Sequence, residues 1–136
     1  MGSRKMVTLG ATLISLVVAA ASARALDLNG AWAGDADNCS KVFARKGAQL
    51  GFTDMSDVYG GGFIVDGDQI VGKFARCRIK ARKDNGPNVN LVAACATDMM
   101  LSSIQFSLKE VDANSIIRLF PGMEEMEIRY FRCPAS

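Results

Sequence analysis

Four cysteines and the absence of histidine set the chemistry that this 136-residue chain can perform. Without histidine, neither a Ser-His-Asp triad nor a Cys-His pair can form. The cysteines stand 38, 18 and 38 residues apart, whereas structural zinc sites bring their ligands in closely spaced pairs. We therefore expect the cysteines to form two disulfides, and we predict no bound metal and no cofactor.

Two other groups of residues bear on chemistry, one acidic and one rich in methionine. The acidic group comprises Glu124, Glu125 and Glu127. Glycosidases need two carboxyl groups in contrasting environments across a cleft, so acids clustered in one segment are more typical of a solvated loop. Methionine sulfur is a soft ligand for copper(I), but without cysteine or histidine ligands core packing is the simpler interpretation; this group comprises Met99, Met100, Met123 and Met126. No catalytic residue is predicted.

A basic segment is the candidate binding surface, with cations at Arg76, Arg78, Lys80 and Arg82. On a strand, alternate residues share one face and stand about 6.6 to 6.8 Å apart, so these four would form a ladder roughly 20 Å long. One interpretation is a solvated strand face. The functional interpretation is a site for an anionic partner, such as envelope phosphates, acidic glycans or an acidic protein patch.

A hairpin turn at residues 84–87 positions this basic segment. Folding the chain about Gly86 places Cys77 opposite Cys95, since each is nine residues from that glycine. The basic residues then lie on the face opposite the cysteines. The same register pairs Ala75 with Thr97, Ile79 with Ala93, and Ala81 with Leu91.

The hairpin chooses among the three pairings that four cysteines allow. A bridge between Cys77 and Cys95 suits the register, and it leaves Cys39 to join Cys133. The second bridge would tie the two ends of the folded chain together. Disulfides in a small chain are typical of exported proteins.

The first 25 residues have the layout of a secretory signal peptide. Arg4 and Lys5 precede an apolar run that ends in small residues, and cleavage is expected after Ala25, with Ala23 as a competing site. The alternative is a membrane anchor, because the run approaches the roughly 18 residues of a transmembrane helix; its alanine-rich end favours removal. Residues 26–136 would then form a single periplasmic or secreted domain with no transmembrane span.

Cleavage would also change the net charge of the protein. The whole chain carries +2, but loss of Arg4, Lys5 and Arg24 reduces 16 basic residues to 13 against 14 acidic ones, a net of −1. This balance argues against a dedicated nucleic-acid-binding protein.

Hydrophobic patterning of the remaining chain is mostly that of strands. A short helix is expected from Cys39 to Lys46, with Gly47 ending it. Elsewhere, alternation and turn residues predict seven or eight strands, and a bulge near Gly72 is expected to bury Phe74. The fold class is therefore an all-β antiparallel meander, closed as a small barrel or sandwich, with one short N-terminal helix and two disulfides.

The first expected strand contains Gly30-x-Trp32, which resembles the opening motif of lipocalin-like barrels. In those barrels the tryptophan closes one end beneath a late arginine. The resemblance implies that Gly30 and Trp32 belong to the barrel-end core and that Arg129 or Arg132 stacks on the indole ring.

The whole pattern of residues 26–136 is also similar to a group of small exported α-proteobacterial proteins with no assigned activity. The similarity lies in the Tyr59 and triple-glycine segment, in residues 93–98 and in residues 120–123. It implies a compartment and no chemistry. We expect a non-catalytic exported binding module that acts on an anionic envelope partner or as an inhibitor; the alternatives are a structural envelope protein that persists under stress and, more weakly, a carboxylate-based hydrolase.

Overall fold

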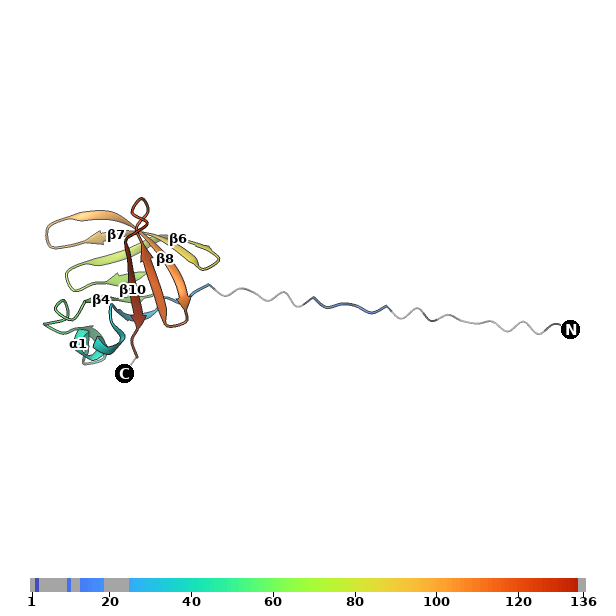
Figure 1. The fold of residues 1–136 in the computed structure, drawn as a ribbon, viewed down its shortest axis with the longest axis horizontal. Helices are drawn as coiled ribbons and strands as arrows, with labels where there is room; N and C mark the ends of the chain where they lie inside the picture. Colours follow the sequence, from blue (N-terminus) through green and yellow to red (C-terminus); the bar gives the residue numbers. More distant parts are fainter. Residues whose placement is uncertain (1, 3–9, 11–12, 19–24, 135–136) are drawn as a thin grey trace.

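The structure is a computed structural model of the chain that describes residues 2, 10, 13–18 and 25–134 (Figure 1). Most of the expected signal peptide, including the competing cleavage site at Ala23, lies outside the described residues. Within the part of the chain that is described, no helix has both the length and the apolar character needed to cross a bilayer.

Eight antiparallel strands close into a barrel, in the order β1-β10-β9-β8-β7-β6-β5-β4. Closure occurs because β1 pairs with β4 on one side and with β10 on the other. The strands are β1 (Gly30–Ala33), β4 (Gly62–Asp66), β5 (Gln69–Val71), β6 (Arg76–Asn85), β7 (Asn88–Ala96), β8 (Leu101–Asp112), β9 (Ser115–Leu119) and β10 (Glu127–Arg132). The prediction of an all-β antiparallel barrel with one short helix and two disulfides is confirmed.

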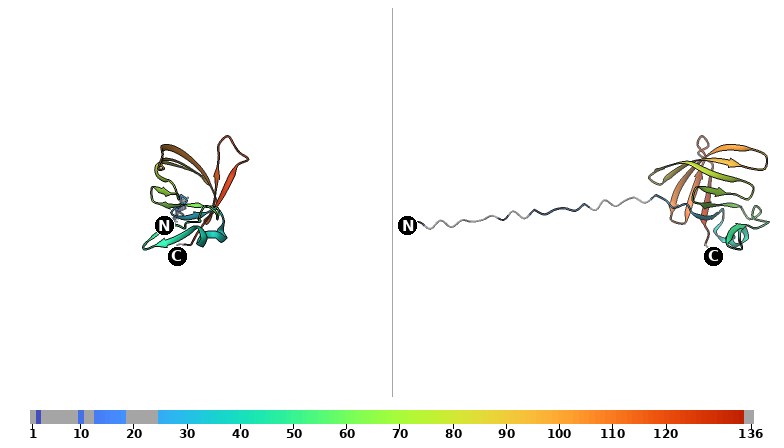
Figure 2. Two further views of the ribbon diagram at one scale, coloured as in Figure 1. Left: turned by 90° about the vertical axis from the view of Figure 1, so that its left-hand side faces the viewer. Right: turned by 180° about the vertical axis from the view of Figure 1, so that it is seen from behind.

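A second, smaller layer covers the outside of the barrel between β1 and the end of the chain (Figure 2). It consists of η1 (Ala36–Asn38), α1 (Cys39–Val42), β2 (Phe43–Lys46) and β3 (Gln49–Phe52). Its side chains form a hydrophobic cluster with the outward side chains of β1, made of Ala31, Ala33, Val42, Phe43 and Cys133. The barrel therefore has one core inside and one outside its wall.

The predicted helix from Cys39 to Lys46 is too long, because α1 ends at Val42. The next four residues form strand β2, which pairs with β3 around a turn at Gly47, whose φ of 69° suits glycine. Pairing places Phe43 opposite Phe52, with 5.3 Å between the ring centroids. Phe43 is buried, and its pairing with Phe52 overrides the helical pattern of the sequence.

Both predicted disulfides are present. Cys77 and Cys95 are directly paired across β6 and β7, with their Cα atoms 4.0 Å apart. Cys39 and Cys133 link α1 to the segment after β10 across 94 residues of sequence. The barrel and its outer layer are thus joined by a covalent bond.

The predicted register of the central hairpin is correct from the cysteines to Ile79 and wrong between Ile79 and the turn. Ile79 pairs with Ala93 as predicted, but a β-bulge follows, so that Ala81 pairs with Val92 and not with Leu91. The extra residue in the bulge is Lys80, and it moves every later residue of β6 to the opposite face. The four basic residues therefore do not share one face.

Phe74 also departs from the prediction, since 72% of the residue is exposed. It lies in the loop between β5 and β6, where the Gly72 N–H donates to the Ala75 carbonyl over 2.8 Å. This tight loop turns Phe74 outward. The bulge expected near Gly72 is instead at Lys80, within β6.

Candidate functional site

One end of the barrel is filled by Trp32, which is fully buried as predicted. Its indole N–H donates to the Leu28 carbonyl over 2.8 Å. Seven other buried residues pack with it inside the barrel: Leu28, Val65, Ile70, Val89, Leu91, Leu108 and Ile116. This half of the interior is called the packed end below.

Arg132 covers the indole ring from the outside of the packed end. Its guanidinium carbon lies 4.3 Å from the ring centroid, so of the two arginines expected to stack on Trp32, it is Arg132 that does. The guanidinium also donates to three backbone carbonyls, those of Asp27, Asn29 and Ala113. It thereby joins the segment before β1 to the turn between β8 and β9.

The backbone conformation at residue 30 and its closeness to Arg132 both favour a glycine there. Its φ is 123°, a conformation that other residues rarely adopt, and a Cβ there would lie 3.3 Å from a terminal nitrogen of Arg132. Gly30 and Trp32 are thus both parts of the closed barrel end.

The other half of the interior contains a cavity of about 440 Å³. Five residues of the packed end also line this cavity, namely Leu28, Val65, Ile70, Leu91 and Leu108. From there the lining extends to the loops after β5 and β7. Met100, which lines the cavity, is 61% exposed, so the cavity reaches the surface there. The half of the interior around this cavity is called the hollow half below.

Alternation along the strands explains the apolar lining of the hollow half. On β8, every second residue from Ser102 to Leu108 faces the cavity, and the intervening side chains face outward. The disulfide between Cys77 and Cys95 forms part of the opposite wall. Most other lining side chains are apolar, including Phe63, Val65, Ile70, Leu91, Ile104 and Phe106.

Arg118 is the charged residue of this lining, and it was not singled out from the sequence. It follows the fully buried Ile116 by two residues on β9, which places it on the inner face. Its guanidinium lies over the rings of Phe106 and Phe120, at 4.7 and 4.9 Å from their centroids. The sequence does contain a signal for it. Arg118 alternates with Ile116 and Phe120, so if these two apolar residues face inward, Arg118 does as well.

The four basic residues of β6 are in different environments. Arg76 is exposed and lies beside the outer groove described below. Arg78 forms an ion pair of 3.0 Å with Asp68, and Lys80 occupies the bulge. Arg82, which pairs with the inward-facing Leu91, binds the Leu26 carbonyl and the Asp84 carboxylate. The prediction that the four share one face is wrong, because the bulge turns Arg82 to the inner face. Their role in binding an anionic partner stays a prediction.

Comparisons with protein-family models, with curated proteins and with solved structures found no match. The resemblances to lipocalin-like barrels and to small exported proteins therefore stay predictions.

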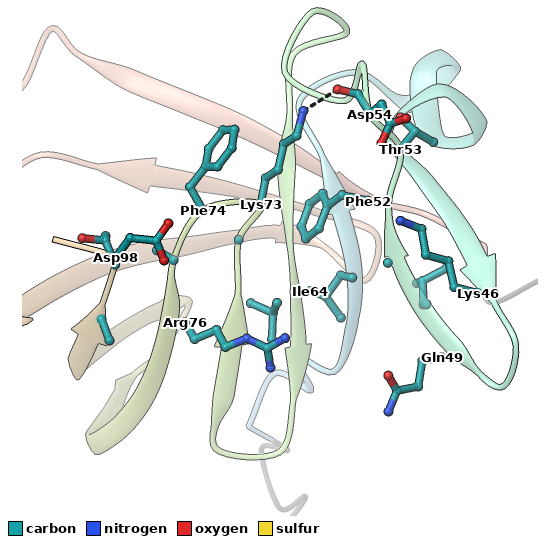
Figure 3. A pocket seen from close by; sticks show the side chains of 17 residues that line it. Lys46, Gln49, Phe52, Thr53, Asp54, Ile64, Lys73, Phe74, Arg76 and Asp98 are labelled. Carbon is teal, nitrogen blue, oxygen red and sulfur yellow. Dashed lines mark hydrogen bonds between the residues drawn. The ribbon is translucent and has the colours of Figure 1, made fainter. Parts of the chain in front are cut away.

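An outer groove of about 670 Å³ runs between the β2–β3 hairpin and strands β4 to β6 (Figure 3). Arg76 lies on the barrel side and Lys46 on the hairpin side, with Ile64 between them. Lys73, at one end of the groove, donates to the Asp57 carboxylate over 2.7 Å, and this hydrogen bond lowers the pKa of Asp57. Because acids such as Asp54 and Asp98 also line it, the groove carries mixed charge.

The acidic and methionine-rich segments are exposed. Glu124 and Glu125 follow β9, Glu127 begins β10, and all three are exposed as expected of a solvated loop. The interpretation of the methionines as core residues is wrong, because the four are between 50% and 93% exposed: Met99, Met100, Met123 and Met126. Among the described residues, no three His, Cys, Asp or Glu side chains gather in a way that could hold a metal ion.

Proposed function

We propose that the protein is a non-catalytic binding module that holds the apolar part of a small ligand in the hollow half of its barrel. The observation that carries this proposal is the cavity of about 440 Å³ with its mostly apolar lining. Ligand pockets in proteins are concave, about 300 to 1,000 Å³ in volume, and apolar apart from a few polar groups. The cavity has each of these properties.

The expected compartment agrees with this function. Both disulfides are formed in the structure, and disulfides persist in oxidising surroundings outside the cytosol. Together with the signal peptide expected at residues 1–25, they support a periplasmic or secreted location. An exported carrier or receptor for small apolar molecules is the class of protein that we propose.

A neutral apolar fluorophore, N-phenyl-1-naphthylamine, tests this proposal directly. We expect saturable binding to the protein with one site per chain and an increase in fluorescence. Replacing Ser102, a half-buried cavity residue, with phenylalanine should abolish binding by filling the cavity. The free energy of unfolding should change by no more than about 1 kcal/mol, since the added ring enters open space and not a packed core.

The matched control is Ser103→Phe, because Ser103 is the next residue on β8 and is exposed on the outer face. This variant should bind the fluorophore as the parent does. Absence of binding by the parent, or equal binding by the Ser102→Phe variant, would show that the cavity is not a ligand site.

An anionic partner on the outside of the barrel is a second proposal, now restricted to two residues. Arg76 and Lys80 are exposed and, among the described residues, have no ion pair. Arg76 also lines the outer groove.

A further inference from the structure

Arg118 differs from Arg78, Arg82 and Arg132 in lacking a polar partner. Arg132 donates to three carbonyls, Arg82 binds a carbonyl and a carboxylate, and Arg78 is paired with an acid. Among the described residues, Arg118 makes no hydrogen bond through its side chain and no ion pair. Its contacts are with the two phenyl rings.

These ring contacts position the guanidinium without using its hydrogen-bond donors. The group is planar, with five N–H donors directed outward in its plane, and stacking on aromatic rings occupies its faces. Phe106 lies on β8, and Phe120 directly follows the neighbouring strand β9, so both rings that hold the group are attached to the barrel wall. The donors are thus oriented and still available.

The lining of the cavity also holds no charge that compensates Arg118. The residues that line the cavity include the polar side chains of Thr97, Ser102 and Tyr130, but no aspartate or glutamate. A half-buried cation without an acid is unfavourable unless something else supplies the negative charge. A carboxylate does so with good geometry, since its two oxygens accept two parallel N–H bonds from a guanidinium.

We propose that the ligand of the hollow half is amphipathic, with a hydrocarbon chain in the cavity and a carboxylate bound by Arg118. This inference rests on the proposed function of the cavity. The apolar lining recognises the chain, and Arg118 selects ligands by charge and fixes which end of the ligand lies at β9. Tyr130 and Ser102 supply neutral polar groups in the same cavity.

Dodecanoate and dodecanol test the inference, because they share a chain and differ in charge. Their affinities are measured by displacement of N-phenyl-1-naphthylamine, below the micelle concentration. The parent protein should bind dodecanoate at least about tenfold more tightly than dodecanol. Replacing Arg118 with methionine should weaken dodecanoate binding by about tenfold to a hundredfold, the range for a lost hydrogen bond to a charged group, and leave dodecanol binding within about twofold.

Two further variants make the result specific. Arg118→Lys keeps the charge but loses the planar pair of donors, so its dodecanoate affinity should be intermediate. Arg129→Met makes the same change at an exposed position on β10 and should leave both affinities unchanged. Thermal unfolding shows whether Arg118→Met folds. If it does not, the dodecanoate affinity of Arg118→Lys relative to the parent decides whether Arg118 binds the carboxylate.

The outcomes separate the two proposals. Equal affinity of the parent for dodecanoate and dodecanol, or equal loss of both in Arg118→Met, overturns the role of Arg118 and leaves the cavity as a site for neutral ligands. Failure of the parent to bind the fluorophore and both dodecyl compounds overturns the proposed function, and the carboxylate inference with it.

Discussion

The two halves of the barrel interior are built from the same strands and differ in the size of their inward side chains. In the packed end, away from the cavity lining, Trp32, Val89 and Ile116 are at most 2% exposed. At the loop end of the hollow half, inward positions carry small residues, namely Gly72, Ala75, Thr97 and Ser102. The cavity follows from these small residues, because the backbone of a closed barrel cannot collapse onto the space that they leave.

This difference indicates how stability and binding are divided within one small domain. Large buried side chains provide most of the hydrophobic free energy of folding, and here they gather around Trp32. The hollow half encloses open space, so its side chains bury less apolar surface against one another. Its wall includes the disulfide between Cys77 and Cys95. Substitutions in the two halves should therefore change the free energy of unfolding by different amounts.

The largest effect is expected for Trp32→Ala, in the packed end. Loss of a large core aromatic costs about 3 to 5 kcal/mol, and the stack with Arg132 is lost as well. Denaturant unfolding followed by circular dichroism measures the change. The matched variant in the hollow half is Ile104→Ala, for which we expect less than about 2 kcal/mol, because Ile104 already borders open space.

Equal destabilisation by Trp32→Ala and Ile104→Ala would contradict the division into a packed and a hollow half. Intrinsic fluorescence gives an independent check of the packed end, because Trp32 is the chain's only tryptophan and is fully buried. An emission maximum typical of water-exposed indole in the folded protein would place Trp32 outside the core.

An intermediate effect is expected from removing the disulfide in the cavity wall. The double variant Cys77→Ala/Cys95→Ala releases a loop closed over 18 residues, for which chain-entropy estimates give about 3 kcal/mol. Hydrogen exchange should then show lost protection mainly in β6 and β7, while amides around Trp32 keep theirs. A uniform loss of protection across both halves would show that the disulfide stabilises the whole barrel and not the hollow half in particular.

Local rules in the sequence were sufficient to predict the framework of the fold. The nine-residue symmetry about Gly86 predicted the Cys77–Cys95 disulfide, and the remaining two cysteines then had to pair. Polar and apolar alternation predicted β8, with Ile104 and Leu108 both on its inner face. The Cys77–Cys95 bridge and β8 depend on residues close in sequence, and the Cys39–Cys133 bridge follows from the two cysteines that remain. None of the three required knowledge of contacts between distant segments.

The errors and omissions arose where a distant contact or one extra residue decided the outcome. The predicted helix extends past Val42 because the strand that pairs with Phe43 could not be recognised. That strand contains Phe52, and the sequence around it shows no sustained hydrophobic alternation. The bulge at Lys80 has no local signal, and it alone moved Arg82 to the other face. Arg118 was missed because its partners, the cavity and the ring of Phe106, exist only after β8 pairs with β9.

The smallest effect on stability is expected outside the barrel, at Arg76 and Lys80. Both are exposed, so Arg76→Gln/Lys80→Gln should change the free energy of unfolding by no more than about 0.5 kcal/mol. If this outer face binds an anionic partner, the variant should bind vesicles containing phosphatidylglycerol more weakly at low salt, by up to about 1 kcal/mol per cation removed. Binding of the apolar fluorophore in the cavity should not change.

The matched control for this surface is Arg78→Gln/Arg82→Gln, which removes the same two charges from the same strand. Because Arg78 and Arg82 are already paired with Asp68 and Asp84, we expect their loss to weaken vesicle binding less. Arg82 also holds the Leu26 carbonyl, so the unfolding free energy of the control is measured first. Equal vesicle binding by the parent and the Arg76→Gln/Lys80→Gln variant would show that this face is only solvated, and binding would then belong to the hollow half alone.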